Sequence, residues 1–275
     1  MKRSRGKFRA SPISQSTVPD SGFKFCLTMT VSEREIEKTR CDVNFTNEGP
    51  IPKLVYSDEQ KTVTLDAGFL EGSGSGRNDG CDTVIYKREV LCRQIVFMKE
   101  SVITRGNTGY IFGASGVGTS IATYYFAATI CGDWDTIWVH RKAQEVPGGP
   151  VSYNCIEISE GTKYISRDHS SESMEEYLKS KKAAARSRNC LLVLDGYFGA
   201  LYEVKLLQTC HDWLNEKGRF LRRFILTASF LLEDSEALKT HPHDSFLVHS
   251  WTLAEYQEAC RNKDLWDSVK KFMDA

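Results

Sequence analysis

The sequence predicts an α/β protein with a mostly parallel sheet covered by helices on both faces, preceded by a small β-rich unit. Short apolar runs alternate with longer segments of helical character over the last two thirds of the chain, which is typical of strand–helix–strand units. One run, residues 110–112, enters a glycine-rich turn, and another, residues 190–194, ends directly in Asp195. Between residues 23 and 65, apolar and polar residues alternate with a period of two, which predicts strands.

The composition is that of a globular protein without a charge bias. Of the 275 residues, 41% are hydrophobic and 26% are charged, which is enough apolar material for a buried core. The 36 basic and 36 acidic residues cancel, so nucleic acid or an anionic membrane would need a local patch. The nine cysteines contain no Cys-x-x-Cys pair, which fits a reducing compartment and predicts no zinc site. No run approaches the roughly 18 apolar residues of a membrane span and no signal peptide is visible, so we expect an intracellular protein, nuclear or cytoplasmic, that does not bind a membrane.

Composition also divides the chain into an arm, a small unit, a linker and a large domain. Residues 1–22 are basic and then rich in serine and proline, which predicts a flexible basic arm. Nucleic acid or a nuclear import factor would bind through this arm, although a solvated tail without a role fits it equally well. Residues 23–70 are expected to form the β-rich unit, residues 71–80 a glycine- and serine-rich linker, and residues 81–275 the main domain.

Within the main domain, buried strands are predicted from short apolar runs, at residues 110–112, 136–140, 189–194, 222–229 and 246–250. Helices are predicted from helical spacing or polar surface composition, at residues 82–100, 173–186, 201–216, 252–260 and 263–273. Ser173 and Glu176 have the spacing of a capping box. Residues 156–159 and 162–165 are expected to form a hairpin around Gly161.

The turn after residues 110–112 has the composition of a loop that binds phosphate. It reads Gly113-Ala114-Ser115-Gly116-Val117-Gly118-Thr119-Ser120, close to the nucleotide-binding pattern G-x-x-x-x-G-K-[ST] of a P-loop. Glycines permit positive φ angles and close approach of the backbone, and the amides at the start of the following helix attract an anion. We therefore expect a P-loop NTPase-like domain in which ATP or GTP binds through these residues: Gly113, Ser115, Gly116, Val117, Gly118, Thr119 and Ser120.

The same pattern predicts a Mg²⁺ ion but little hydrolysis. Ser120 is expected to ligate Mg²⁺, and Asp195, at the carboxyl edge of a parallel sheet, to complete the ion's outer shell. Thr227 and Ser229, at the end of another strand, are candidate sensors of the γ-phosphate. Thr119 stands where the pattern has lysine, and losing one such electrostatic contact typically costs about 3 kcal/mol in a transition state. We therefore expect nucleotide binding with weak or absent hydrolysis.

Two other interpretations remain open. The glycines also resemble the turn of an NAD(P)-binding oxidoreductase, with Tyr177 and Lys181 in Tyr-x-x-x-Lys spacing and Arg141-Lys142 placed for a 2′-phosphate. The tyrosine follows the loop by only about 60 residues, which is early for that layout. Alternatively, the loop merely turns a strand into a helix, in a non-catalytic interaction or effector module that binds a protein partner. Histidines 140, 211 and 249 are interpreted as core or surface residues.

Four motifs follow one another in the main domain: Arg88-Glu89-Val90, the glycine loop 113–120, Leu191 to Gly196, and Ser250-Trp251-Thr252-Leu253-Ala254-Glu255-Tyr256. From about Tyr86 onward, their order resembles the ATPase region shared by Crinkler-type effectors and trypanosomatid retrotransposon hot spot proteins, with the last motif the most specific. The resemblance implies a P-loop ATPase fold, ATP with Mg²⁺, and association with the nucleus. The family's loop has lysine where Thr119 stands, which counts against ATPase activity, and we expect no nuclease domain.

Overall fold

The computed structural model describes residues 43–52, 54, 61–75, 80–142, 150–183, 188–216, 221–229, 236–262 and 265, all within one compact unit. The predicted basic arm at residues 1–22 lies outside them, as do the first part of the predicted β-rich unit and all of the predicted helix 263–273 except Leu265. Among the described helices, none has the length and apolar character that a membrane crossing requires.

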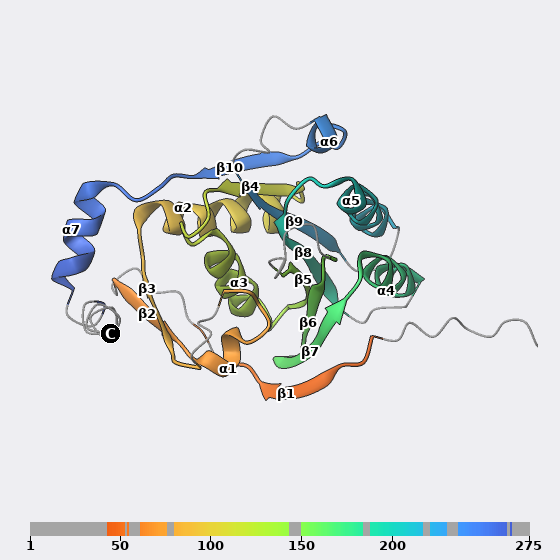
Figure 1. Cartoon of the computed structure of the whole chain (residues 1–275), viewed down its shortest axis with the longest axis horizontal. Helices are drawn as coiled ribbons and strands as arrows, with labels where there is room; N and C mark the ends of the chain where they lie inside the picture. The colour runs from red at the N-terminus through yellow and green to blue at the C-terminus, as the bar shows by residue number, and fades with distance from the viewer. Residues whose placement is uncertain are drawn as a thin grey trace, which may run out of the picture. The chain divides into compact units, whose positions relative to one another are not determined.

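An eight-stranded sheet forms the centre of the described chain, in the order β1-β7-β6-β5-β8-β9-β4-β10 (Figure 1). The strands are β1 (Thr46–Pro50), β4 (Gly109–Gly113), β5 (Trp134–Arg141), β6 (Tyr153–Ser159), β7 (Thr162–His169), β8 (Asn189–Tyr197), β9 (Arg222–Ser229) and β10 (Asp244–Val248). The five strands β5, β8, β9, β4 and β10 are parallel, and β6, β7 and β1 continue the sheet with antiparallel pairing. The predicted α/β class with a large, mostly parallel sheet is therefore confirmed, and the predicted hairpin is present as β6 and β7.

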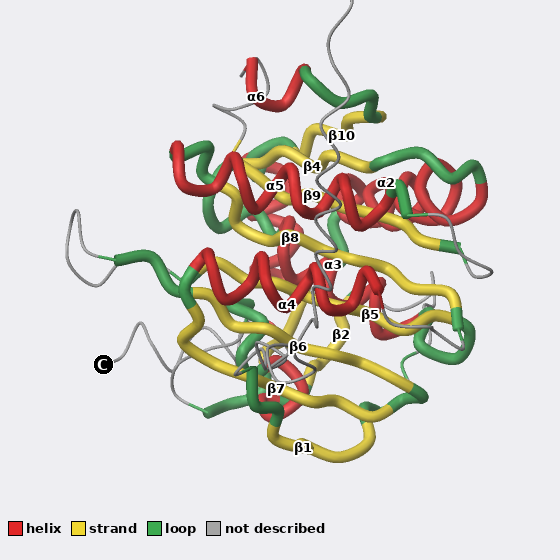
Figure 2. Tube along the Cα trace, turned by 90° about the vertical axis from the view of Figure 1, so that its right-hand side faces the viewer, coloured by secondary structure: helices red, strands yellow, loops and turns green. Residues whose placement is uncertain are grey.

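Helices cover both faces of this sheet (Figures 1 and 2). One face packs against α1 (Ala67–Leu70), α2 (Glu89–Phe97), the π-helix η1 (Met98–Thr104) and α3 (Thr119–Thr129). The other face packs against α4 (Ser171–Ala183) and α5 (Leu201–Leu214), which Figure 2 shows side by side over the strands. Two further helices, α6 (Glu236–Lys239) and α7 (Leu253–Arg261), flank β10 in the sequence.

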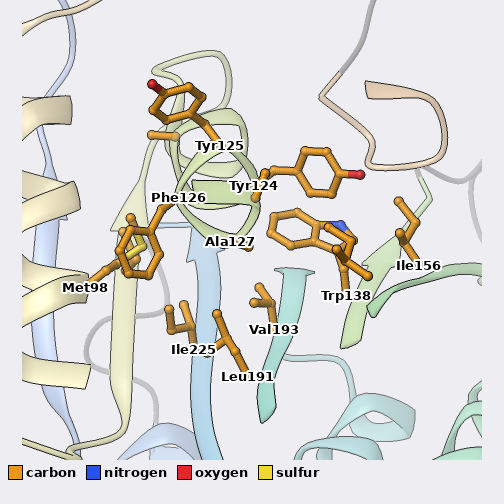
Figure 3. Close-up of a cluster of buried hydrophobic side chains, with 14 of the residues drawn as sticks. Met98, Tyr124, Tyr125, Phe126, Ala127, Trp138, Ile156, Leu191, Val193 and Ile225 are labelled. Carbon is orange, nitrogen blue, oxygen red and sulfur yellow. The ribbon is translucent and has the colours of Figure 1, made fainter. Parts of the chain in front are cut away.

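Successive side chains along a strand point to opposite faces of the sheet and therefore pack into different layers of the core. In β8, Leu191 and Val193 pack with α3, whereas Leu192 and Leu194 pack with α4 and α5. Figure 3 shows the α3 side of the core, where side chains of the helix lie over those of three strands: Tyr124, Phe126 and Ala127 over Trp138, Val193 and Ile225. Burying one large apolar side chain contributes about 1.5–3 kcal/mol, so packing holds α3 more firmly than helix propensity does.

Residues 82–100, predicted as one helix, form a strand followed by two helical segments. β3 (Thr83–Tyr86) pairs in antiparallel register with β2 (Thr62–Leu65) in a second, two-stranded sheet. α2 begins only at Glu89. Thr83-Val84-Ile85-Tyr86 is a run of β-branched and aromatic residues, which favours an extended chain over a helix. This part of the prediction is therefore wrong.

The helix predicted at residues 173–186 begins two residues earlier, at Ser171. The Oγ of Ser170 accepts a hydrogen bond from the backbone N–H of Ser173 at 3.2 Å, so Ser170 serves as the N-cap. The predicted capping box at Ser173 and Glu176 is wrong, because this serine-rich stretch offers an earlier hydroxyl to the unpaired amides of the first turn.

The start of the predicted linker packs against the large sheet. The buried Lys163 ammonium donates at 2.7, 3.1 and 2.8 Å to three backbone carbonyls, those of Gly68, Phe69 and Glu71. A Cβ on Gly72 would lie 1.9 Å from the Ile165 Cδ1 atom, so this glycine permits close packing rather than flexibility. Because β1 also pairs with β7, the described residues before the predicted boundary at 71–80 belong to the same compact unit as those after it.

Four aromatic rings meet near the amino end of β4. The Tyr110 hydroxyl lies 2.8 Å from His211 Nε2, while His241 stacks on His211 and His243 on Tyr110, with ring centroids 3.6 and 3.9 Å apart. Burial, together with the proximity of His241 and His243, lowers the pKa of His211 to about 3. The folded protein therefore keeps this imidazole neutral at neutral pH.

Replacing His211 with phenylalanine should reduce the acid sensitivity of the fold. The pKa of His211 is about 3 in the folded protein against an ordinary 6.5, so below pH 6.5 the unfolded chain binds the extra proton. Stability then falls with decreasing pH, by up to about 1.4 kcal/mol per pH unit from this group. Urea unfolding at neutral pH and near pH 5 measures the effect. We expect wild type to lose stability relative to His211→Phe on acidification; a constant difference would contradict this.

Candidate functional site

A cleft of about 630 Å³ opens at the carboxyl ends of three neighbouring strands. Its walls are the turn from β4 into α3 (residues 113–121, without Val117), the end of β8 (residues 196–198) and the end of β9 (residues 227–229). Residues 74–75, from the predicted linker, complete the lining. Small-molecule pockets usually have volumes of about 300–1,000 Å³, so the cleft has a suitable size for such a ligand.

The turn from β4 into α3 requires glycine at three positions. A Cβ on Gly113 would lie 2.4 Å from the Thr119 Oγ1 atom, and Gly116 and Gly118 have φ angles of +80° and +96°. Other residue types would be strained at these positions, so the glycine pattern has a steric cause. The 11-residue helix α3 begins at Thr119. Its first turn carries unpaired N–H groups, and Thr119 and Ser120 in that turn line the cleft.

Thr119, at the position of the missing lysine, is 9% exposed and belongs to the cleft wall. Its Oγ1 atom has no hydrogen-bond partner among the described residues. Its carbonyl oxygen accepts from Gln94 Nε2 at 3.0 Å and from Thr123 Oγ1 at 2.9 Å, which fixes the first turn of α3. A buried polar group without a partner costs about 1–3 kcal/mol. Its oxygen is buried against the loop beside Gly113, so a group bound in the cleft would reach this hydroxyl only after the side chain turns.

Asp195 lies beneath the cleft rather than in its wall. β8 continues past it to Tyr197 and the carboxylate is fully buried, whereas the sequence predicted that it emerges at the carboxyl edge of the sheet, beside the loop. The Oδ2 atom lies 2.7 Å from His140 Nδ1, and the Thr227 hydroxyl donates to Oδ1. With Asp195 ionised, this bond requires a proton on His140 Nδ1, because a carboxylate can only accept. Both oxygens of Asp195 are thus occupied by neighbouring strands.

His140, Asp195 and Thr227 form a hydrogen-bonded row across β5, β8 and β9. The parallel register places His140 directly opposite Asp195. The pairing of β8 with β9 is irregular just beyond this point, and there the Gly196 N–H donates to Thr227 Oγ1 at 3.1 Å. The row therefore supplies hydrogen bonds where the regular ladder ends, and it holds Thr227 in the cleft wall.

The structure brings most predicted binding residues together in the cleft: Gly113, Ser115, Gly116, Gly118, Thr119, Ser120, Thr227 and Ser229. Val117 is the exception in the loop, because its side chain is buried in the core on the α3 face. Sequence reasoning missed His140, although both it and Asp195 end apolar runs that a parallel sheet aligns. It also missed Tyr197 and Phe198, for which the sequence gives no signal.

No charged side chain lines the cleft among the residues that the structure describes. Arg141, considered above for a 2′-phosphate, is paired with Glu203 at 2.8 Å and lies over the Phe198 ring at 5.1 Å from its centroid. Within the same residues, no group of three or more histidine, cysteine or acidic side chains is arranged to hold a metal ion. An anion in the cleft would therefore be bound there by backbone amides and hydroxyls.

The Tyr177 and Lys181 pair has a structural use away from the cleft. Both residues lie on α4, where the Tyr177 hydroxyl donates to Glu157 and Lys181 pairs with the same carboxylate at 2.5 Å. Neither residue lines the cleft, which is formed by the turn into α3 and the ends of β8 and β9. The geometry therefore gives no support to an oxidoreductase site built from this pair.

Fold and cleft together define an α/β protein with a glycine loop at the carboxyl edge of a parallel sheet. No protein-family model and no curated protein matches the chain. The groups that line the cleft are backbone amides, the hydroxyl residues Ser115, Thr119, Ser120, Thr227 and Ser229, and the aromatic rings of Tyr197 and Phe198, of which Phe198 is 62% exposed.

Thr227→Val should destabilise the protein while preserving the shape of the side chain. The variant removes the hydrogen bond to the buried Asp195 carboxylate and leaves the Gly196 N–H without its acceptor. We expect the free energy of unfolding to fall by about 1–3 kcal/mol. Urea denaturation measures the change, and Thr227→Ser, which keeps the hydroxyl, is the matched control. Equal stability of the valine and serine variants would show that the row contributes nothing.

Proposed function

We propose that the cleft binds the phosphate groups of a nucleotide, ATP or GTP, with weak or absent hydrolysis. The observation that carries the proposal is the turn from β4 into α3. It combines two glycines at positive φ, the unpaired amides of an 11-residue helix, and the buried hydroxyl of Thr119 without a partner among the described residues. Such an arrangement presents several donors to one anion.

The position of the cleft in the fold supports a ligand site. The chain leaves β4 for β5, on the β9 side of β4, whereas it leaves β9 for β10, on the opposite side of β4. Because crossovers between parallel strands are right-handed, these two connections run on opposite faces of the sheet, where α3 and Leu238 of α6 pack, and a crevice opens between them at the carboxyl ends of β4 and β9. Ligands of open α/β sheets bind preferentially at such a switch point.

Without a lysine in the loop, the site can still bind a nucleotide, but it lacks a charge that hydrolysis needs. Hydrogen bonds to a charged group contribute about 1.5–3 kcal/mol each, so several amides and hydroxyls suffice for measurable affinity. Hydrolysis additionally needs stabilisation of the charge that develops on the transferred phosphoryl group. Thr119 provides a neutral donor at that position, and no described residue of the cleft wall provides a charge. We therefore propose that this site binds the nucleotide and hydrolyses it weakly or not at all.

Asp195 does not fit the expected part in a Mg²⁺ site. Mg²⁺ in nucleotide sites is usually held by one or two carboxylates together with phosphate oxygens. Asp195 is fully buried beneath the cleft and does not line it, and each of its oxygens already accepts a hydrogen bond from a neighbouring strand, so an ion in the cleft would not meet this carboxylate directly. Ser120 remains as a hydroxyl ligand. In the proposal, Mg²⁺ therefore accompanies the phosphates and gains little from the protein.

The resemblance to the ATPase region of Crinkler-type effectors and retrotransposon hot spot proteins agrees with this proposal, and we extend it to a nuclear role for the chain. A non-catalytic interaction module is the second candidate. It is favoured by α7, on which Leu253 and Tyr256 are 73% and 53% exposed. Exposed apolar side chains on one helix suit a protein partner.

Titration with labelled ATP, GTP and NADPH, with and without Mg²⁺, tests the proposal. We expect saturable binding of a triphosphate, weakened by Ser120→Ala, with only a small effect of Mg²⁺. Ser173→Ala on the distant helix α4 is the control. Binding of NADPH alone would favour the oxidoreductase, and binding of none of the three would leave the interaction module.

Thr119→Lys should increase affinity for the triphosphate. The new ammonium would add a charge-assisted contact to the phosphates, for which we expect about a tenfold tighter dissociation constant, equivalent to roughly 1.4 kcal/mol. Thr119→Met, which has a long side chain without charge, is the control. Isothermal titration at two salt concentrations measures the affinity and its electrostatic part. An unchanged affinity would mean that the loop is not shaped around a phosphate.

A further inference from the structure

Arg88, immediately before α2, is a buried cation with partners in three separate segments. Its side chain is 1% exposed. Nη1 donates to the Val117 carbonyl of the glycine loop at 3.2 Å, and Nη2 donates to the His249 carbonyl after β10 at 2.7 Å. Nε lies 3.1 Å from the Glu255 carboxylate on α7. One guanidinium therefore connects the loop, the end of β10 and α7.

The Trp251 to Tyr256 motif forms the rest of this contact. The Trp251 ring lies 4.7 Å from the Arg88 Cζ atom, and Thr252 caps α7 while its N–H donates to Glu255 at 2.7 Å. Burial raises the pKa of Glu255, but the hydrogen bonds from Thr252 and Arg88 outweigh it and lower the pKa overall. Two motifs that are far apart in the sequence thus meet as an ion pair beneath the glycine loop.

The Val117–Gly118 peptide is trans, so its C=O and N–H groups point in opposite directions. Arg88 holds the C=O, and neither Arg88 nor Val117 lines the cleft, whereas Gly118 does. The Gly118 N–H has no hydrogen-bond partner within the described residues. We propose that Arg88 is a positioning residue that directs the Gly118 amide at an anion in the cleft. The inference rests on the proposed function of that cleft.

An arginine suits this task better than other residues. Its planar group has five donors and can serve two carbonyls and a carboxylate at once, whereas a lysine ammonium cannot match that planar arrangement. The constraint is needed because Gly118, at a φ angle of +96°, can also adopt negative φ at little cost. Without Arg88 the peptide is free to rotate, which would turn the carbonyl oxygen, and its negative partial charge, towards the anion.

One resonance reports directly on this peptide. Val117–Gly118 is the only valine–glycine step in the sequence. Labelling with ¹³C-carbonyl valine and ¹⁵N-glycine therefore gives a single cross-peak in a two-dimensional HNCO spectrum of the whole chain. Its carbonyl shift reports the hydrogen bond from Arg88, and its amide proton shift reports contact with an added anion. The probes are inorganic pyrophosphate and ATP.

Two variants and a control define the test. Arg88→Met removes every donor, and Arg88→Lys keeps the charge, so that the milder variant is available where the first fails to fold. Arg93→Met, at an exposed position of α2, is the control. We expect Arg88→Met to move the Val117 carbonyl shift without ligand and to weaken ATP and pyrophosphate binding about tenfold or more. Arg88→Lys should give a smaller change in both, and Arg93→Met should match wild type.

The outcomes separate this inference from the proposed function. A wild-type peak that does not respond to pyrophosphate or ATP overturns the binding of phosphate, and with it the role of the Gly118 amide. A wild-type peak that responds, combined with an unchanged carbonyl shift and unchanged affinity in the Arg88 variants, overturns only the role of Arg88. A large loss of thermal stability in Arg88→Lys with unchanged pyrophosphate affinity would likewise reduce Arg88 to a structural residue.

Discussion

The structure at the carboxyl edge of the sheet depends on the hydrogen bonds that offset the desolvation of the buried Asp195 carboxylate. A buried carboxylate without partners is strongly unfavourable, so each oxygen must meet a donor. The donors come from the strands on either side, His140 of β5 and Thr227 of β9. These bonds tie β5, β8 and β9 together at the point where the regular ladder ends, and the cleft opens directly above them. Asp195, whose position in the sequence suggests a metal ligand, thus connects the three strands beneath the cleft in the structure.

Local sequence patterns predict most of the helices and strands correctly. The elements that they predict wrongly are those whose conformation depends on packing against residues far away in the sequence. The alternation of apolar runs and helical segments predicts the α/β class, and the glycines predict the turn at residues 113–118, because each signal resides in neighbouring residues. The strand at Thr83–Tyr86 and the packing of residues 67–75 follow from partners far away in the sequence, β2 and Lys163. Glycines within a linker and glycines beneath a packed side chain look identical in a sequence.

The residues of the candidate site likewise fall into those that the sequence could predict and those that it could not. Its loop and hydroxyl residues could be predicted, since the pattern of a phosphate loop is continuous in the sequence. The partners of Asp195 could not be predicted, because they depend on the register between neighbouring strands and on the residue at which β8 ends. The structure also shows the environment of Thr119: its hydroxyl is buried against the loop, without a partner among the described residues, at the position where the P-loop pattern has a lysine.

The strand order also bears on the sequence of events in folding. β4 carries the glycine loop and lies between β9 and β10, both of which follow it by more than a hundred residues in the chain. Arg88 and Glu255, which meet beneath that loop, are 167 residues apart. During synthesis from the N-terminus, the loop therefore leaves the ribosome long before either neighbouring strand or the α7 carboxylate exists. Contacts of such long range close late and slow the search for the native state. We therefore expect the cleft to be among the last described parts of this protein to form, and a chain interrupted before α7 to have the loop without the contacts from Glu255 that fix it.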